Sequence, residues 1–290
     1  MRLTITAYSA ALFSTWVFIE ELGLLFDAGD GVSAGLTQKS GKIKNVFITH
    51  ADRDHVCGLL QLHQLNARDG NPTIYYPKDC GSFEPLRDFF ARFDPQSGPA
   101  TWIGLDNDQA IDLSHGYQVI AQRSEHVQKD GLVKAFGFTL SHTRKRLKAE
   151  FQGLSGKEIA AKKQELGEGG ISETITDKLL GYSGDSPALI PSDWRGVKLL
   201  LHEATFLKPE TTRGSHASLP QVIEAASSLS LDALVLMHFS SRYKPDAIKA
   251  AINMQAERHK PSFPIFAIMP GSLCRDILKQ DPVYRPNECL

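Results

Sequence analysis

The segment Thr49 to His55, THADRDH, concentrates metal-binding residue types: His50, Asp52, Asp54 and His55 fall within six positions. Imidazole nitrogens and carboxylate oxygens are the side-chain ligands of Zn, Mn and Fe. Two carboxylates so close together on one tight loop repel each other unless a cation compensates their charge. A solvated charged loop would have the same composition and is the alternative. The segment follows the apolar run VFIT, so the sequence predicts a metal-binding loop at the end of a buried strand.

Other polar residues also end apolar segments. These segments and their final residues are VFIT with His50, YQVIAQRSE with His126, LLGYSG with Asp185, KLLL with His202, and LVLM with His238. Side chains at the ends of rigid strands can converge on one edge of a sheet. Taken singly, each histidine is more simply a hydrogen-bonded core residue, and the aspartate an Asx turn. Only their combination with the first loop predicts a shared site.

The elements that must position these residues are strands followed by alternating helices and strands. Alternating or continuous apolar runs predict strands near the N-terminus, and helical spacing of apolar residues predicts helices after Asp30, over 219–230 and over 244–258. The chain has 290 residues, 42% hydrophobic and 22% charged, with a net charge of −1. This composition supports a sizeable core and gives no overall positive field for nucleic acid. Without repeats or linkers, one domain over 1–290 is expected.

The four cysteines and the N-terminus bear on the compartment. Cys57, Cys80, Cys274 and Cys289 are widely spaced, form no CxxC motif and are expected to be reduced thiols. The apolar stretch from Tyr8 to Ile19 is followed at once by two glutamates and lacks a cleavage motif. No stretch has the length of a membrane span. We therefore expect a cytoplasmic protein with no membrane partner.

The motifs together resemble a known family. The order HxDxDH, a lone His, the Asp of YSGDS and a late His is similar to the metallo-β-lactamase fold. HEATF at His202–Phe206, HFSSRY at His238–Tyr243 and GSHAS around His216 resemble motifs of its ribonuclease Z branch. The resemblance implies an α/β fold, a four-layer αββα sandwich of metallo-β-lactamase type.

Carried over residue by residue, the resemblance implies a site with two divalent metal ions. The first would be held by His50, Asp52 and His126, the second by Asp54, His55 and His238, and Asp185 would bridge them. Asp54 would also orient the attacking hydroxide. His202 would donate a proton or support the ligands, and Arg242 would contact the phosphate or, alternatively, form only a surface ion pair. Glu203 could orient His202, although neighbours on a strand point to opposite faces.

Two features depart from the ribonuclease Z pattern. Asp52 stands where the family usually has a second histidine. Zinc is the metal we expect first, but Asp52 adds a third carboxylate to the site, and this favours Mn or Fe relative to zinc. The interval Val127 to Gly184 looks too short for the protruding tRNA-binding arm of that branch. Its basic runs Thr143–Lys148 and Lys157–Lys163 either bind RNA phosphate or form a solvated helix face.

The expected function is therefore a dinuclear phosphodiesterase of ribonuclease Z type that cleaves precursor tRNA at its 3′ end. A phosphodiesterase or other hydrolase of small molecules is the alternative, favoured by the missing arm and the neutral charge. An iron-loaded redox protein or a non-catalytic binding protein is a third, supported only by Asp52. A homodimer through Val56–Leu65 would fit the ribonuclease Z branch.

Overall fold

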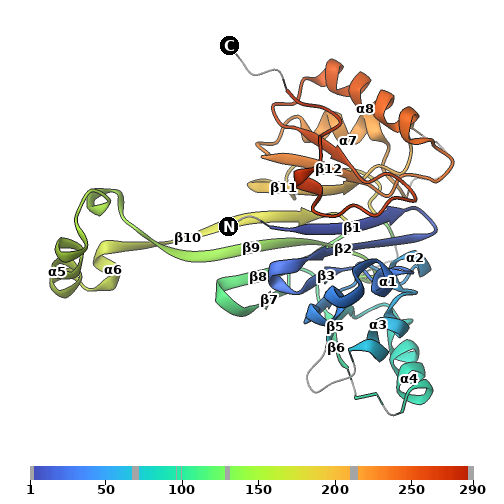
Figure 1. Ribbon diagram of the computed structural model, residues 1–290, viewed down its shortest axis with the longest axis horizontal. Coiled ribbons are helices and arrows are strands. Elements are labelled where there is room, and N and C mark those ends of the chain that lie inside the picture. The colour runs from blue at the N-terminus through green and yellow to red at the C-terminus, as the bar shows by residue number, and fades with distance from the viewer. Residues whose placement is uncertain are drawn as a thin grey trace.

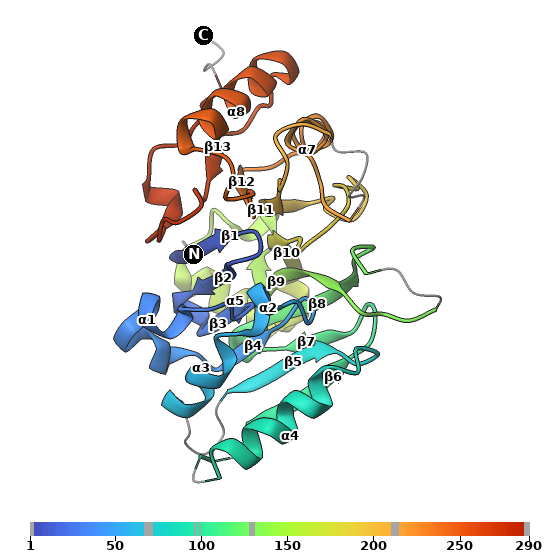
Figure 2. The same ribbon diagram turned by 90° about the vertical axis from the view of Figure 1, so that its right-hand side faces the viewer.

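The computed structural model describes residues 3–66, 72–95, 97–98, 100–127, 131–209 and 215–286. Two β-sheets pack face to face, and helices cover their outer faces (Figures 1 and 2). This arrangement is the four-layer αββα sandwich expected from the sequence. No helix within the described ranges is long and apolar enough to span a membrane.

The first sheet has six strands in chain order among the described residues. They are β1 (Ile5–Ala10), β2 (Ser14–Ile19), β3 (Leu24–Phe26), β4 (Asn45–Phe47), β5 (Thr73–Pro77) and β6 (Thr101–Leu105). The pairs β1–β2 and β2–β3 are antiparallel, and β3 to β6 are parallel. The parallel strands therefore end at one edge, where β4 leads into the THADRDH loop.

The second sheet has seven strands within the described part of the chain, in the order β13-β12-β11-β10-β9-β8-β7. They are β7 (Ala110–Asp112), β8 (Tyr117–Arg123), β9 (Phe136–Leu147), β10 (Ser172–Tyr182), β11 (Val197–Glu203), β12 (Ala233–Met237) and β13 (Ile265–Ala267). Strands β10 to β13 run parallel, so β10, β11 and β12 deliver Asp185, Glu203 and His238 to the same edge.

Helices cover both outer faces. On the first sheet lie α1 (Val32–Leu36), α2 (Arg53–Val56), α3 (Leu59–Leu65) and α4 (Phe83–Phe93), and on the second lie α7 (Leu219–Ala226) and α8 (Pro245–His259). The helices expected after Asp30, over 219–230 and over 244–258 are confirmed as α1, α7 and α8. Strand alternation separates the layers: in β11, Leu199 and Leu201 enter the core between the sheets and Leu200 packs under α7 and α8.

An arm projects from the sandwich and corrects one expectation. Strands β9 and β10 continue beyond the sheet as an antiparallel pair whose tip carries α5 (Gly156–Leu166) and α6 (Glu168–Ile171) (Figure 1). Helix α5 begins with a capping box between Ser155 and Glu158. The prediction that this interval is too short for an arm is therefore wrong. Two strands of 12 and 11 residues reach far because an extended residue spans about 3.3 Å, roughly twice the rise of a helical one.

Candidate metal centre

The THADRDH loop folds tightly between β4 and α2, and its side chains turn towards the edge shared by both sheets. Helix α2 begins directly after Asp52, whose carboxylate makes no capping bond and so remains free for the site. The opposite loop comes close at Gly184, whose φ is +56°; a Cβ there would lie 2.6 Å from the Thr49 side chain. Glycine thus lets the YSGDS turn bring Asp185 against the loop.

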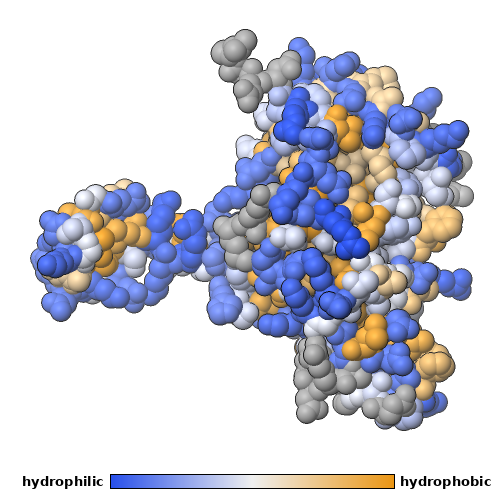
Figure 3. Space-filling view, in the orientation of Figure 1, coloured by the Kyte–Doolittle hydropathy of each residue, from blue (hydrophilic) through white to orange (hydrophobic). Residues whose placement is uncertain are grey.

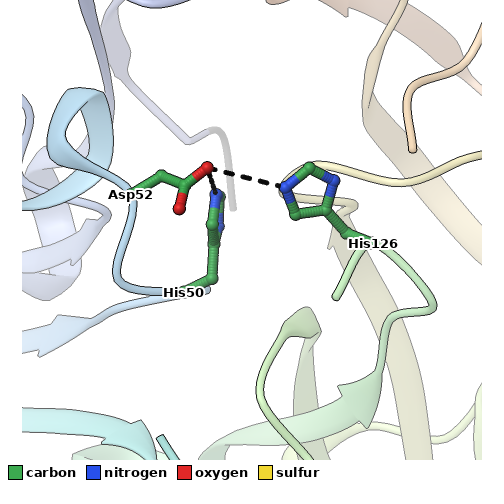
Figure 4. Close-up of side chains that lie close together, drawn as sticks. All are labelled: His50, Asp52 and His126. Atoms are coloured by element: carbon green, nitrogen blue, oxygen red, sulfur yellow. Dashed lines mark ion pairs between the residues drawn. The ribbon is translucent and has the colours of Figure 1, made fainter. Parts of the chain in front are cut away.

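The first group of ligands consists of His50, Asp52 and His126, which Figure 4 shows converging from two sheets. Asp52 Oδ2 lies 3.6 Å from His50 Nε2 and 3.8 Å from His126 Nε2. The Asp52 side chain is 60% exposed, whereas both histidines are almost completely buried. The replacement aspartate therefore still reaches the position that the resemblance implies, from the solvent side.

The second group consists of Asp54, His55 and His238, and Asp185 lies between the two groups. Asp54 Oδ2 is 3.7 Å from His55 Nε2 and 3.3 Å from His238 Nε2. Asp185 Oδ1 faces this group, 3.4 Å from His55 Nε2 and 3.3 Å from His238 Nε2. Its Oδ2 faces the first group, 3.6 Å from His50 Nε2 and 3.8 Å from His126 Nε2. One carboxylate thus serves both groups.

These donors fit divalent metal ions. His50 Nε2, His55 Nε2 and Asp185 Oδ1 are buried without a hydrogen-bond partner, which is costly unless something else binds them. Ligands about 2.0–2.1 Å from a tetrahedral metal are roughly 3.3 Å apart, close to the separations found here. Borderline nitrogen and hard oxygen donors together suit Zn, Mn or Fe. The chemistry and the spacing of the donors therefore support two metal positions.

A buried aspartate outside the two groups orients His55. Asp27 Oδ2 lies 2.8 Å from His55 Nδ1 and accepts a hydrogen bond of 2.7 Å from the Tyr182 hydroxyl. Its Oδ1 accepts hydrogen bonds from the backbone N–H and the hydroxyl of Thr49 at 2.8 and 2.9 Å. Because Asp27 accepts a hydrogen bond from the Nδ1–H group of His55, the lone pair of Nε2 is left for a metal.

The other histidines have partners of the same kind. His50 Nδ1 lies 2.9 Å from the Thr49 hydroxyl, and His126 Nδ1 lies 2.8 Å from the Ser215 carbonyl oxygen. His238 Nδ1 is 3.0 Å from the hydroxyl of Thr205. His238 also has a left-handed backbone with φ of 59°, an uncommon conformation for a residue with a side chain. The strained backbone of His238 thus lies where its side chain directs Nε2 to the site.

The carboxylates change the protonation of the histidines when no cation is bound. Burial disfavours the cation of His126, but the nearby carboxylate of Asp52 and the charge of Asp185 raise its pKa to about 9. The pKa of Asp52 is lowered strongly, first by its close approach to His126 and then by that to His50. A metal would therefore compete with a proton at His126.

The side chain of His202 points away from both ligand groups, so the structure does not support its expected role as proton donor. Its side chain is fully buried, and Nδ1 bonds to the carbonyl oxygen of Glu203, its neighbour in β11. Strand alternation turns His202 towards the layer of Leu200 and turns Glu203 towards the site. Glu203 could orient His202 at the site only if both side chains pointed to the same face of β11.

His216 is the site residue that our assignment of roles missed. Its Nδ1 lies 3.0 Å from Glu203 Oε1 and 3.8 Å from Asp185 Oδ2, and its ring is 4.8 Å from that of His126. Burial lowers the pKa of His216, but the hydrogen bond to Glu203 and the charges nearby raise it overall. The GSHAS motif had marked this residue, whose preceding Gly214 lies outside the described residues.

Arg242 lies at the outside of this corner. Its guanidinium stacks over the rings of Phe206 and Tyr243 at 5.1 and 5.2 Å, and Phe206 in turn contacts the ring of His216 at 6.2 Å. One aromatic ring thus separates Arg242 from a residue of the site. Its contact with a phosphate remains a prediction.

Comparisons with known proteins agree with this geometry. Residues 24–153 match the model of the β-lactamase superfamily domain. The chain is 29% identical to ribonuclease Z of Archaeoglobus fulgidus over 77% of this chain and 80% of that protein. It is 28% identical to a chloroplastic tRNase Z of Arabidopsis thaliana over 82% of this chain and 68% of that protein. Its fold resembles human tRNase Z, short form, with a TM-score of 0.55 and 22% identity over 83% of this chain and 93% of that one.

The two sheets and the four layers define a metallo-β-lactamase fold, and the paired groups at its edge could hold metal ions. Together with the relatives, they place the chain in the class of metal-dependent hydrolases. Within that fold the chain is similar to proteins named ribonuclease Z and tRNase Z, at 28–29% identity. The family resemblance and the fold expected from the sequence are thereby confirmed.

Proposed function

We propose that this protein is a dinuclear phosphodiesterase of ribonuclease Z type, acting on the 3′ end of precursor tRNA. The observation that carries the proposal is the division of Asp185 between two ligand groups, Oδ1 towards His55 and His238 and Oδ2 towards His50 and His126. A bridging carboxylate holds two ions at the separation that suits an in-line displacement at phosphorus.

The chain's own residues divide the work around the phosphate. Two divalent ions, zinc first and Mn or Fe as alternatives, would supply an acidified water and neutralise phosphate charge. Asp54 accepts the Leu12 N–H at 2.9 Å and lies against His238, which positions its carboxylate to orient the attacking oxygen. His216, held by Glu203 beside Asp185, is placed to protonate the leaving alkoxide.

The arm supports an RNA substrate. It extends well outside the sandwich and its surface is largely hydrophilic, with a hydrophobic patch near the tip (Figures 1 and 3). From His142 to Lys178, both included, the sequence has eight Lys or Arg and six Asp or Glu residues, a net charge of +2. Such an arm can contact the phosphates of an RNA away from the metal centre. These contacts orient the RNA without recognising its sequence.

The test is cleavage of a precursor tRNA with a 3′ trailer by the metal-loaded protein, alongside bis(p-nitrophenyl) phosphate. We expect single cleavage of the trailer and loss of both activities in Asp185→Asn. A variant of the arm, with Lys157, Lys162 and Lys163 all changed to Ala, should lose tRNA cleavage and keep turnover of the small ester. No turnover of either substrate with two metals bound would refute the proposal.

A second candidate, a phosphodiesterase of small molecules, is favoured by the ion pairs of the arm. Arg144, Lys145 and Arg146 pair with Asp177, Glu168 and Glu173 at 3.4, 3.2 and 2.7 Å. Such pairing reduces the positive potential available to RNA. Full turnover of the small ester without tRNA cleavage would select this candidate.

We also propose a homodimer through Val56–Leu65. Helix α3 lies in that range and presents Leu65 with 56% of its surface exposed. A monomeric mass in light scattering at micromolar concentration would contradict this part of the proposal.

A further inference from the structure

An aromatic pocket lies at the turn between β1 and β2, where the adjacent Leu12 bonds to Asp54 of the second ligand group. Its walls include Tyr8, Phe13 and Trp16, with Asp30 and Gly35 among the residues that face them. The rings of Tyr8 and Trp16 stack with their centroids 6.5 Å apart. Phe13 is 62% exposed, so its ring is available to a ligand rather than to the core. Trp16 is almost completely buried, so Phe13 provides the exposed aromatic face, and such a face can bind flat apolar groups.

The pocket has a fixed position relative to the second ligand group. The residue before Phe13 is Leu12, whose backbone N–H donates to Asp54 Oδ2 at 2.9 Å. On the other side, the Ser14 hydroxyl donates to the carbonyl oxygen of Asp30 at 2.7 Å. Leu12 has φ of 69°, a left-handed conformation that favours glycine, yet it carries a side chain that is 83% exposed. The turn therefore holds two exposed apolar side chains rigidly at the edge of the site.

Gly29 makes the close packing of this turn possible. A Cβ on Gly29 would lie 2.3 Å from the backbone oxygen of Asp54 and 2.5 Å from the backbone nitrogen of Thr15. The hairpin and the metal loop thus both pack closely against the backbone of Gly29. A ligand held on Phe13 therefore has a fixed position relative to Asp54 and the second ligand group.

The charge of the pocket selects the kind of group it takes. Asp30 is exposed on the pocket wall, and its carboxylate disfavours a second phosphate there. A carboxylate accepts hydrogen bonds from an exocyclic amine such as that of cytosine. Aromatic side chains stack with bases of any sequence. The pocket therefore favours a ligand group that is flat, carries an amino group at its edge and has no negative charge. A nucleobase with an exocyclic amine has all three properties.

We propose that this pocket binds the base of a nucleotide whose phosphate lies at the metal centre, with Phe13 as the stacking residue. The inference rests on the proposed function only in placing a phosphate at the metals. It adds a base-binding site that is separate from the arm and lies on the side of Asp54.

The experiment compares two ligands that differ only in the base. Zinc-loaded protein is titrated calorimetrically with adenosine 5′-monophosphate and with ribose 5-phosphate. We expect the nucleotide to bind roughly tenfold more tightly. Phe13→Ala should bring the ratio of the two dissociation constants close to one, and Phe13→Trp should preserve it. Phe93→Ala is the matched control, because Phe93 is 60% exposed on α4 and does not line this pocket.

Equal affinity for both ligands in the wild-type protein, or an unchanged ratio in Phe13→Ala, would overturn the inference. Metal content of each variant, measured by elemental analysis, shows whether the ligand groups remain intact. Because binding is measured without turnover, the outcome is independent of catalysis. A preference for the nucleotide in a protein that hydrolyses no phosphodiester would refute the proposed function and leave the pocket established.

Discussion

Replacing Asp27 by Asn should weaken one metal position and spare the other. Asp27 touches no expected ligand of the first group, but its Oδ2 lies 2.8 Å from Nδ1 of His55 in the second group. In the asparagine variant the amide oxygen keeps the hydrogen bonds from the Thr49 N–H and hydroxyl, which are 2.8 and 2.9 Å long. The amide NH₂ then faces His55 and acts as a donor.

A donor at this position favours the wrong tautomer of His55. Nδ1 becomes the acceptor, and the proton moves to Nε2, the atom 3.4 Å from Asp185 Oδ1 that must present a lone pair to the metal. Losing such a partner typically costs 10–100-fold in metal affinity, about 1.4–2.7 kcal/mol. We expect a loss of this size at the position of Asp54, His55 and His238 alone.

The assay is competition for zinc with a chromogenic chelator, which resolves two binding constants. Tyr182→Phe is the matched control, because it removes the 2.7 Å hydrogen bond to Asp27 Oδ2 but leaves the carboxylate in place. That variant should bind both ions within about threefold of the wild-type protein. Two unchanged constants in Asp27→Asn, or two constants lowered equally, would refute the tautomer argument.

Three further outcomes are expected. First, the pKa of His126 is raised to about 9, so the metal-free protein holds a proton there at pH 7.5 and metal binding should release it; affinity then rises with pH up to about 9. The same raised pKa stabilises the metal-free fold at low pH and ceases to do so as pH passes 9. Calorimetry in buffers of different ionisation enthalpy measures the release, and no buffer dependence would contradict it. Second, Asp52→His should shift the retained metal towards zinc and away from Mn and Fe, measured by elemental analysis after incubation with an equimolar mixture; an unchanged ratio would show that residue 52 does not set the preference. Third, His216→Ala should lower kcat about 10²–10⁴-fold for an alkoxide leaving group and much less for p-nitrophenolate, whereas His202→Ala should lower the free energy of unfolding. Equal effects on both leaving groups would argue against proton donation by His216.

The candidate metal ligands could be picked out from the sequence because much of their spacing is local. HxDxDH lies within one loop, and the remaining ligands each follow an apolar strand, a position that periodicity can find. Asp185, His126 and His238 therefore came out correctly as neighbours, since ends of adjacent strands meet at one edge. The four-layer fold was implied by the resemblance of these motifs to the metallo-β-lactamase fold.

Only the tertiary structure decided the direction of single side chains and the reach of the arm. His202 and Glu203 are adjacent in sequence, but the pleat sends them into different layers, and His216 reaches Glu203 from 13 residues away. The arm depends on β9 pairing with β10 across residues 136–182, a long-range register that local composition does not reveal. Local spacing indicated which residues could bind metal, whereas strand pairing and alternation decided which histidine lies beside Glu203 and Asp185 and how far the arm extends.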